Sequence, residues 1–177
     1  ENSPVEMQRA GKNHWISTLE FPLDAYIEYA YLRGEERQTD PFNPRRTPNG
    51  MGKFNHFFYM PDGHPTTLSR KNSRIPSGIV SRHTVPCRGL ISGQQRTIYL
   101  YQPAVPGPYP LLVVWDGKDY LRRARIPQIV DALIAQHRIQ PVAMALIENG
   151  GMARYMEYHC SEGTLVFLAS QVLPLAI

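Results

Sequence analysis

The 177-residue sequence has few cysteines, no long apolar run and no large excess of either charge. Its two cysteines, Cys87 and Cys160, lie far apart and outside any metal-ligand spacing, so neither a disulfide scaffold nor a metal site is expected. Reduced thiols favour a cytoplasmic protein. No apolar run reaches the length of a membrane span, and no signal-peptide core begins the chain. We therefore expect no metal, no cofactor and no membrane association.

The charge pattern argues against nucleic-acid binding. The formal net charge is only +4, and the basic residues are scattered through the chain in runs no longer than pairs such as Arg45-Arg46 and Arg122-Arg123. Hydrophobic residues make up 42% of the chain and charged residues 19%, which is typical of a globular protein with a core of its own.

The first part of the chain reads as β structure. Residues 1–14 are polar and predict a flexible N-terminus. Residues 15–65 predict an all-β sandwich, because short alternating stretches are separated by turn-rich segments; the stretches are Trp15–Phe21, Tyr26–Leu32 and Phe54–Met60. The aromatic residues of the last stretch favour a sandwich core, and a carbohydrate or catecholate platform is the alternative. Residues 66–78 have the composition of a linker.

From Ile79 the pattern changes to α/β. Ile79–Val85 and Arg96–Tyr101 alternate like a hairpin, and Leu111–Trp115 and Val142–Ile147 are continuous apolar runs typical of buried strands. Apolar residues at helical spacing follow each run, from Ile126 to Ile134 and from Leu165 to Leu173. This order predicts an α/β domain with a mostly parallel sheet and helices on both faces, in which ligands bind beyond the carboxyl ends of the strands.

These segments carry a family resemblance. YPLLVVWDGKDYL, RIQPVAMALIENG and ARYMEYHCSEGTLVFLASQVLPLAI resemble the first half of the α/β-hydrolase domain of the Putative esterase family, which includes the enterochelin esterases. WISTLEFPLDAYIEYAYL, DPFNP and PNGMG are similar to the β-sandwich that precedes that domain. The resemblance implies that residues 79–177 form the N-terminal half of the hydrolase domain, with four strands and two helices. It also implies a carboxylic-ester hydrolase acting on small-molecule esters such as catecholate siderophores, with a role in iron transport.

The same resemblance implies a Ser-Asp-His triad whose serine lies on a G-x-S-x-G turn after the fifth strand. The sequence contains no such motif, so we expect the triad beyond residue 177 and no activity from this segment alone. In the usual hydrolase sheet the third strand lies between the fourth and the fifth. Leu111–Trp115 would therefore be an open edge, and the C-terminal half of the hydrolase domain is the partner expected to cover it.

One similar motif is H-x-S-x-G at residues 159–163. No buried strand precedes its serine, which argues against a nucleophile. We interpret Ser161 or Thr164 as a helix cap, with Glu162 in the first turn.

The resemblance implies site residues after the third and fourth strands. The backbone N–H of Lys118 is the expected oxyanion-hole donor, Gly117 allows the close approach, and Asp116 lies beside them; a simple Asp-Gly turn is the alternative. Arg154 and Tyr158, in R-x-x-E-Y, are expected to bind substrate, because the guanidinium fork pairs with vicinal oxygens. An Arg154–Glu157 pair that only braces the loop is the alternative.

The remaining histidines are interpreted as surface or packing residues: His14, His56, His64, His83 and His137. A second class of function stays open, namely a non-catalytic module that binds carbohydrate or a protein partner. A G-x-S-x-G motif soon after residue 177 would decide for the enzyme.

Overall fold

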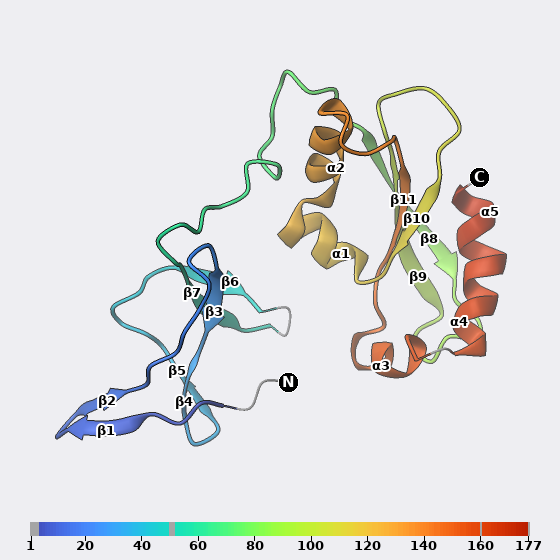
Figure 1. Cartoon of the computed structure of the whole chain (residues 1–177). Helices are drawn as coiled ribbons and strands as arrows, with labels where there is room; N and C mark the ends of the chain where they lie inside the picture. The colour runs from blue at the N-terminus through green and yellow to red at the C-terminus, as the bar shows by residue number, and fades with distance from the viewer. Residues whose placement is uncertain (1–3, 50–51, 160, 177) are drawn as a thin grey trace. The chain divides into compact units, whose positions relative to one another are not determined.

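The computed structural model describes residues 4–49, 52–159 and 161–176. The chain folds as two compact units, Glu1–Pro65 (unit 1) and Thr66–Ile177 (unit 2) (Figure 1).

Unit 1 consists of small antiparallel sheets. Its strands are β1 (Gln8–Gly11), β2 (His14–Ile16), β3 (Tyr26–Tyr29), β4 (Tyr31–Arg33), β5 (Glu36–Gln38), β6 (Arg46–Pro48) and β7 (Phe54–Tyr59). β1 pairs with β2, β4 with β5, and β7 lies between β3 and β6. The aromatic side chains of β7 pack against β3, where the Tyr26 ring lies 5.3 Å from Phe57 and 5.1 Å from Tyr59. The aromatic residues of β7 thus contribute packing within unit 1.

Several sequence-based expectations for unit 1 need correction. The β1–β2 hairpin replaces the flexible segment predicted for residues 1–14, of which 1–3 lie outside the described residues. The strand expected over Trp15–Phe21 ends at Ile16, and β5 and β6 form within a stretch that the sequence suggested was turn-rich connection. A sandwich requires two sheets packed face to face. That arrangement stays a prediction.

A buried polar network holds the loop between β5 and β6. The Asp40 carboxylate accepts hydrogen bonds from the Tyr29 hydroxyl and, at 2.8 Å, from the Phe42 N–H. His56 accepts the Asp40 N–H at Nε2 (3.1 Å), so its Nδ1 carries the proton and donates to the Asn43 carbonyl (2.8 Å). The Tyr29 hydrogen bond, followed by the Phe42 N–H, holds the pKa of Asp40 below its usual value. His56 is therefore a packing residue of this network.

Unit 2 contains a four-stranded sheet in the order β10-β11-β9-β8. Its strands are β8 (Ile79–Pro86), β9 (Gln95–Gln102), β10 (Leu111–Val114) and β11 (Ala143–Ile147). Only β10 and β11 are parallel, whereas β9 runs antiparallel to both β11 and β8. The sheet is therefore mixed, and the expectation of a mostly parallel sheet is wrong. The β8–β9 hairpin, expected from the alternation, is present.

Helices cover both faces of this sheet (Figure 1). On one face lie α1 (Gly117–Asp119), a π-helical turn at Tyr120–Ala124 and α2 (Ile126–Ala135). On the other lies a helical stretch made of α4 (Glu162–Phe167), a π-helical segment at Leu168–Val172 and α5 (Leu173–Ala176). Met144 and Leu146 of β11 pack in the α2 core, while Ala145 and Ile147 pack with Phe167. Because both faces are covered, the whole strand is apolar.

β10 is an edge strand in the part of the chain that the structure describes, since its ladder there is with β11 alone. Leu112 of this strand remains 47% exposed. Cys87 is buried with a free thiol, and Cys160 lies outside the described residues. None of the described helices has the length and apolar character that crossing a membrane requires.

Candidate functional site

The candidate site lies where β10 and β11 end. Asp116, Gly117 and Lys118 follow β10, whereas Asn149 and the segment of α3 (Arg154–Glu157) follow β11, after a 3-10 turn at Gly151–Ala153. Because β10 and β11 are parallel neighbours, both loops leave the sheet at the same edge.

Asp116 is the centre of a polar cluster. Its Oδ1 accepts hydrogen bonds from Asn149 Nδ2 (2.6 Å) and the Tyr158 hydroxyl (3.1 Å). The same oxygen lies 3.5 Å from Nη1 of Arg154. The backbone of Asp116 is left-handed, with φ at 55°. Asp is among the few residue types that tolerate this conformation. Asp116 therefore joins the loop after β10 to the loop after β11.

Gly117 brings the start of α1 against the backbone of β11. A Cβ atom at this position would lie 2.6 Å from the carbonyl carbon of Leu146 and 2.8 Å from the N atom of Ile147. Any larger residue would push α1 away from the strand. The Asp116 carbonyl accepts the N–H groups of Asp119 (2.9 Å) and Tyr120 (3.2 Å), which leaves Gly117 and Lys118 in the first turn, where an N–H has no intrahelical acceptor. These N–H groups are suited to bind an anion.

Aromatic rings flank the charged pair. The guanidinium carbon of Arg154 lies 5.3 Å from the centre of the Tyr155 ring, within cation–π range. The Tyr158 ring lies 5.0 Å from that of Trp115. Burial, together with the negative charge of Asp116, raises the pKa of Tyr158 to about 12. Tyr158 is therefore neutral at physiological pH and donates its proton to Asp116.

A buried ion pair joins α3 to strand β9. Arg96 of β9 binds Glu157 in a bidentate manner, with Nη1–Oε2 at 3.0 Å and Nη2–Oε1 at 2.9 Å. Only 4% of the Arg96 side chain and 1% of the Glu157 side chain are exposed. Burial acts to raise the pKa of Glu157, but the Arg96 guanidinium outweighs it and holds this pKa below the usual range. Glu157 is thus held as a carboxylate between Arg154 and Tyr158.

Two further hydrogen bonds near this pair hold the start of the loop that follows β11. Arg96 also donates to the Glu148 carbonyl (3.1 Å), and Ser92 donates its hydroxyl to the Gly150 carbonyl (3.1 Å). A Cβ atom on Gly150 would overlap Ser92 Oγ and lie 3.0 Å from Glu157 Oε1. Gly150 is therefore needed for close packing at this point of the loop.

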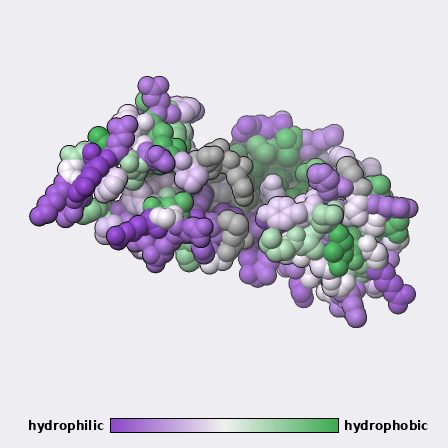
Figure 2. All heavy atoms as spheres, turned by 90° about the horizontal axis from the view of Figure 1, so that it is seen from below, coloured by the Kyte–Doolittle hydropathy of each residue, from purple (hydrophilic) through white to green (hydrophobic). Residues whose placement is uncertain are grey.

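The surface beside this loop is partly apolar. Figure 2 views the molecule from the α3 end of unit 2 and shows hydrophobic residues at the surface among hydrophilic ones. The exposed apolar side chains of this region are Met152 (81%), Met156 (66%), Tyr155 (59%) and Leu165 (63%). No group of acidic, histidine and cysteine side chains suited to a metal ion occurs in the described ranges.

The structure thus brings Asp116, Arg154 and Tyr158 into contact, and Gly117 and Lys118 follow Asp116 in the first turn of α1. Lys118 lies exposed beside them. The alternative Arg154–Glu157 pair is wrong, because Glu157 binds Arg96. Sequence reasoning missed Asn149, although its place just after an apolar strand could have indicated it, and it missed Arg96.

The H-x-S-x-G stretch is not preceded by a buried strand. Residues from Arg154 to Glu157 are helical, and Ser161 is the N-cap residue of α4. Its side chain makes no capping hydrogen bond, whereas Thr164 donates its hydroxyl to the Glu157 carbonyl at 2.7 Å. Cys160, within the motif, lies outside the described residues.

Comparison with known proteins gives a family match and a similar fold. Residues 91–176 match the model of a family described as "Putative esterase". The structure is similar to the enterochelin esterase of Shigella flexneri, with a TM-score of 0.62 and 20% identity over 78% of this chain and 35% of that one. It is also similar to the ferric enterobactin esterase of Salmonella typhimurium, with a TM-score of 0.70 and 17% identity over 96% of this chain and 50% of that one.

A third similar structure is the enterobactin esterase of Shigella flexneri in the presence of enterobactin, with a TM-score of 0.61 and 19% identity over 77% of this chain and 35% of that one. No curated protein matches the chain. The chain therefore spans between a third and a half of the length of these solved structures. At such low identity the similarity establishes the fold. Residues 91–176 thus match the Putative esterase family and lie on the fold of the enterochelin esterases, as the sequence resemblance predicted.

Proposed function

We propose that the chain forms the oxyanion-binding side of the active site of a carboxylic-ester hydrolase. The observation that carries this proposal is the position of the first-turn N–H of Lys118, at the carboxyl end of β10 and beside the Asp116–Arg154 pair. Acyl transfer places negative charge on the carbonyl oxygen. A preorganised N–H donor at that oxygen contributes about 3 kcal/mol to the stabilisation of the transition state.

The Asp116 cluster supports this role. An unpaired carboxylate next to an oxyanion would repel it. Asp116 instead faces a guanidinium and accepts hydrogen bonds from Asn149 and Tyr158, so its charge is offset within the cluster. The same contacts fix the backbone of the loop that presents the Lys118 N–H. Asp116 is in this proposal a positioning residue.

Arg154 is proposed to bind the substrate, a catecholate siderophore ester such as enterobactin. Its side chain is 30% exposed, and its Nη1 lies 3.5 Å from Asp116 Oδ1, which leaves other N–H donors of the fork for vicinal oxygens. The neighbouring Tyr155 and Met156 expose apolar surface on which aromatic rings can pack. Hydrolysis of such an ester would serve iron transport in the cytoplasm.

The reactive groups are proposed to come from a further segment. In this proposal residues 79–177 are the N-terminal half of the hydrolase domain, and the Ser-Asp-His triad belongs to the C-terminal half, whose first strand pairs with the open edge of β10. Among the described residues no strand pairs with that edge, and Leu112 there is 47% exposed. The chain alone is then expected to hydrolyse no ester.

The experiment is turnover of p-nitrophenyl acetate by the full-length protein, with loss of activity on treatment with a serine-reactive phosphonate. Lys118→Ala keeps the backbone N–H and is expected to change kcat by less than about threefold. Lys118→Pro removes the N–H and is expected to lower kcat by about 100-fold to 1000-fold. Equal activity of the two variants would refute the donor role. Absence of turnover in the untreated protein would favour a binding module instead.

The substrate proposal has its own test. Arg154→Met is expected to raise KM for enterobactin by about 10-fold to 100-fold, which is the loss of one charge-assisted contact. The same variant should leave KM for the uncharged p-nitrophenyl acetate unchanged. Arg122→Met, which removes an exposed arginine elsewhere in unit 2, is the control. Equal effects of Arg154→Met on both substrates would contradict the proposal.

A further inference from the structure

Unit 2 contains a cavity at the opposite ends of β10 and β11 from the candidate site. This cavity, of about 500 Å³, lies between the C-terminal end of α2 and the loop that follows β9. This volume is within the range of small-molecule sites, about 300 to 1,000 Å³. Pro141, which precedes β11, also lines it, so the cavity lies at the amino ends of β10 and β11. Nothing in the proposed ester chemistry uses it.

The walls of this cavity are mostly apolar. They are formed by proline, alanine and branched aliphatic side chains, namely Pro76, Pro103, Ala104, Val105, Ile134, Ala135, Ile139 and Pro141. One wall is held in place by Gly78, whose N–H donates to Asp131 at 3.0 Å. A Cβ atom on Gly78 would overlap the Tyr101 ring, so the segment that carries Pro76 packs directly against β9.

Asp131 of α2 supplies the single carboxylate of this cavity. Its side chain is only 8% exposed. Oδ1 accepts the Tyr101 hydroxyl at 2.6 Å and the Gly78 N–H at 3.0 Å. No residue in the described ranges donates a hydrogen bond to Oδ2. Among the described residues, the fully buried side-chain oxygen that lacks a partner is Oε1 of Gln128. Oδ2 of Asp131 also lacks a partner there but is not fully buried, so it reaches the cavity that Asp131 lines.

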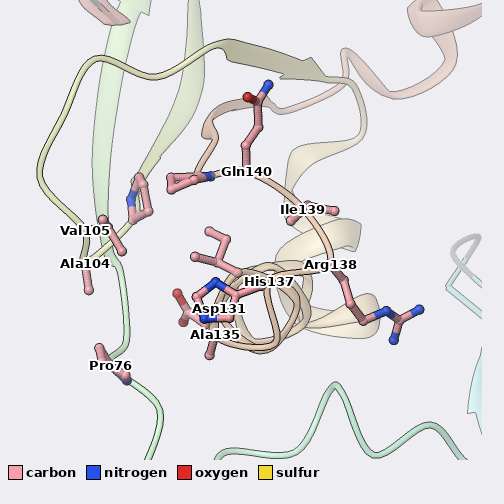
Figure 3. Close-up of a pocket in the computed structure, with 12 residues that line it drawn as sticks. Pro76, Ala104, Val105, Asp131, Ala135, His137, Arg138, Ile139 and Gln140 are labelled. Atoms are coloured by element: carbon pink, nitrogen blue, oxygen red, sulfur yellow. The ribbon is translucent and has the colours of Figure 1, made fainter.

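Two basic side chains, His137 and Arg138, also line this cavity, and among the described residues neither lies within ion-pair distance of Asp131. Figure 3 looks along α2 and shows Asp131 and Ala135 on the side of the helix that faces Pro76 and Ala104. The guanidinium of Arg138 points away from that side. No ion pair joins Asp131 to a basic side chain among the described residues. An apolar cavity with a free carboxylate oxygen at its base favours a cation with an apolar body.

We infer that this cavity binds a small organic amine, whose ammonium group donates to Oδ2 of Asp131 and whose hydrocarbon part fills the space between α2 and the loop after β9. The cavity shares no lining residue with the candidate ester site.

Isothermal titration calorimetry of the full-length protein tests the inference with 2-phenylethylamine, 2-phenylethanol and 3-phenylpropionate. We expect the amine to bind at least 10-fold more tightly than the alcohol, and the carboxylate not to bind. Asp131→Asn keeps an acceptor for Tyr101 and Gly78 but removes the charge, so the amine should then bind no more tightly than the alcohol. Asp62→Asn, in unit 1, is the control and should change nothing.

Ala104→Trp is the second variant, because it fills the cavity from an exposed loop position and leaves Asp131 intact. It should abolish binding of both the amine and the alcohol. Equal affinities for the amine and the alcohol, an unchanged amine affinity in Asp131→Asn, or retained binding in Ala104→Trp would each overturn the inference. If Asp131→Asn fails to fold, Ala104→Trp alone decides.

Discussion

Replacing Glu157 by Gln should destabilise unit 2 strongly, although the two side chains have the same shape. In either orientation the new amide would place its NH₂ group against the guanidinium of Arg96. In one orientation the NH₂ group would also face the Ser92 N–H, which lies 3.3 Å from Oε1 of Glu157. The charge of Arg96 would then remain buried without a counterion, since its side chain is only 4% exposed. Removing one partner of a buried ion pair costs about 3 to 5 kcal/mol.

Equilibrium unfolding in urea measures this cost. In a Trp15→Phe background Trp115 is the remaining tryptophan of the 177-residue chain, and its ring lies 5.0 Å from that of Tyr158, next to Glu157. With a urea m-value of about 2 kcal/mol/M, the expected loss lowers the midpoint by about 1.5 to 2.5 M. The control Glu162→Gln, an exposed acid in the first turn of α4, should cost less than about 1 kcal/mol.

Two further observations separate the ion pair from simple packing. The double variant Arg96→Met with Glu157→Leu should recover most of the lost stability, because it leaves no buried charge. The pKa of Glu157 is lowered in the folded state, so its contribution is present above the ordinary value of 4.5 and is lost as the pH falls through the folded value. The difference between wild type and Glu157→Gln should therefore shrink at acid pH. A midpoint for Glu157→Gln within about 0.2 M of wild type, roughly 0.4 kcal/mol by the same m-value, would refute the reasoning.

Three other predictions concern single contacts. Gly117→Ala should destabilise unit 2 by about 1 to 3 kcal/mol, because its Cβ would lie 2.6 Å from the β11 backbone. The control Gly11→Ala, whose Cβ would meet its nearest atom at 3.5 Å, should cost less than about 1 kcal/mol. Urea unfolding compares the two variants, and equal costs would contradict the clash. Asp116→Asn should lower the pKa of Tyr158 from about 12 toward 10.0 without reaching it, because Tyr158 remains buried. A difference absorbance titration against Tyr158→Phe should detect the shift. An unchanged pKa of Tyr158 would argue against the Asp116 contact. Tyr29→Phe should bring the pKa of Asp40 back toward 3.8, so that the acid unfolding transition of unit 1 moves to higher pH. NMR titration of the Asp40 carboxyl carbon measures this pKa. An unchanged pKa of Asp40 would exclude the Tyr29 hydrogen bond as the cause of its lowering.

The elements of unit 2 were predictable because its core is regular. The apolar runs at β10 and β11 and the spacing of α2 follow from burial on both faces of a sheet, and these signals are local. No local sequence signal determines the direction of β9 relative to β11, so the sheet was expected to be more parallel than it is. In unit 1 the strands are short and largely exposed, and their boundaries depend on turns such as Lys12-Asn13 more than on an apolar pattern.

The candidate site shows the same division. Asp116, Arg154 and Tyr158 were predicted from their place after apolar strands and from the resemblance, and the structure joins them in one cluster. Arg96 read as the polar start of an alternating strand, and nothing near it in the sequence indicated that it would be buried. Its partner is 61 positions away, and only the sheet order brings the two together.

That separation has a consequence for synthesis of the protein on the ribosome. At about 5 to 20 residues per second, Arg96 is translated about 3 to 12 s before Glu157. During this interval the β8–β9 hairpin has no counterion for its guanidinium, which must remain hydrated rather than packed. The hairpin is therefore expected to pack into the sheet only after the segment containing Glu157 has left the exit tunnel, so that α3 and the sheet become ordered in one late step.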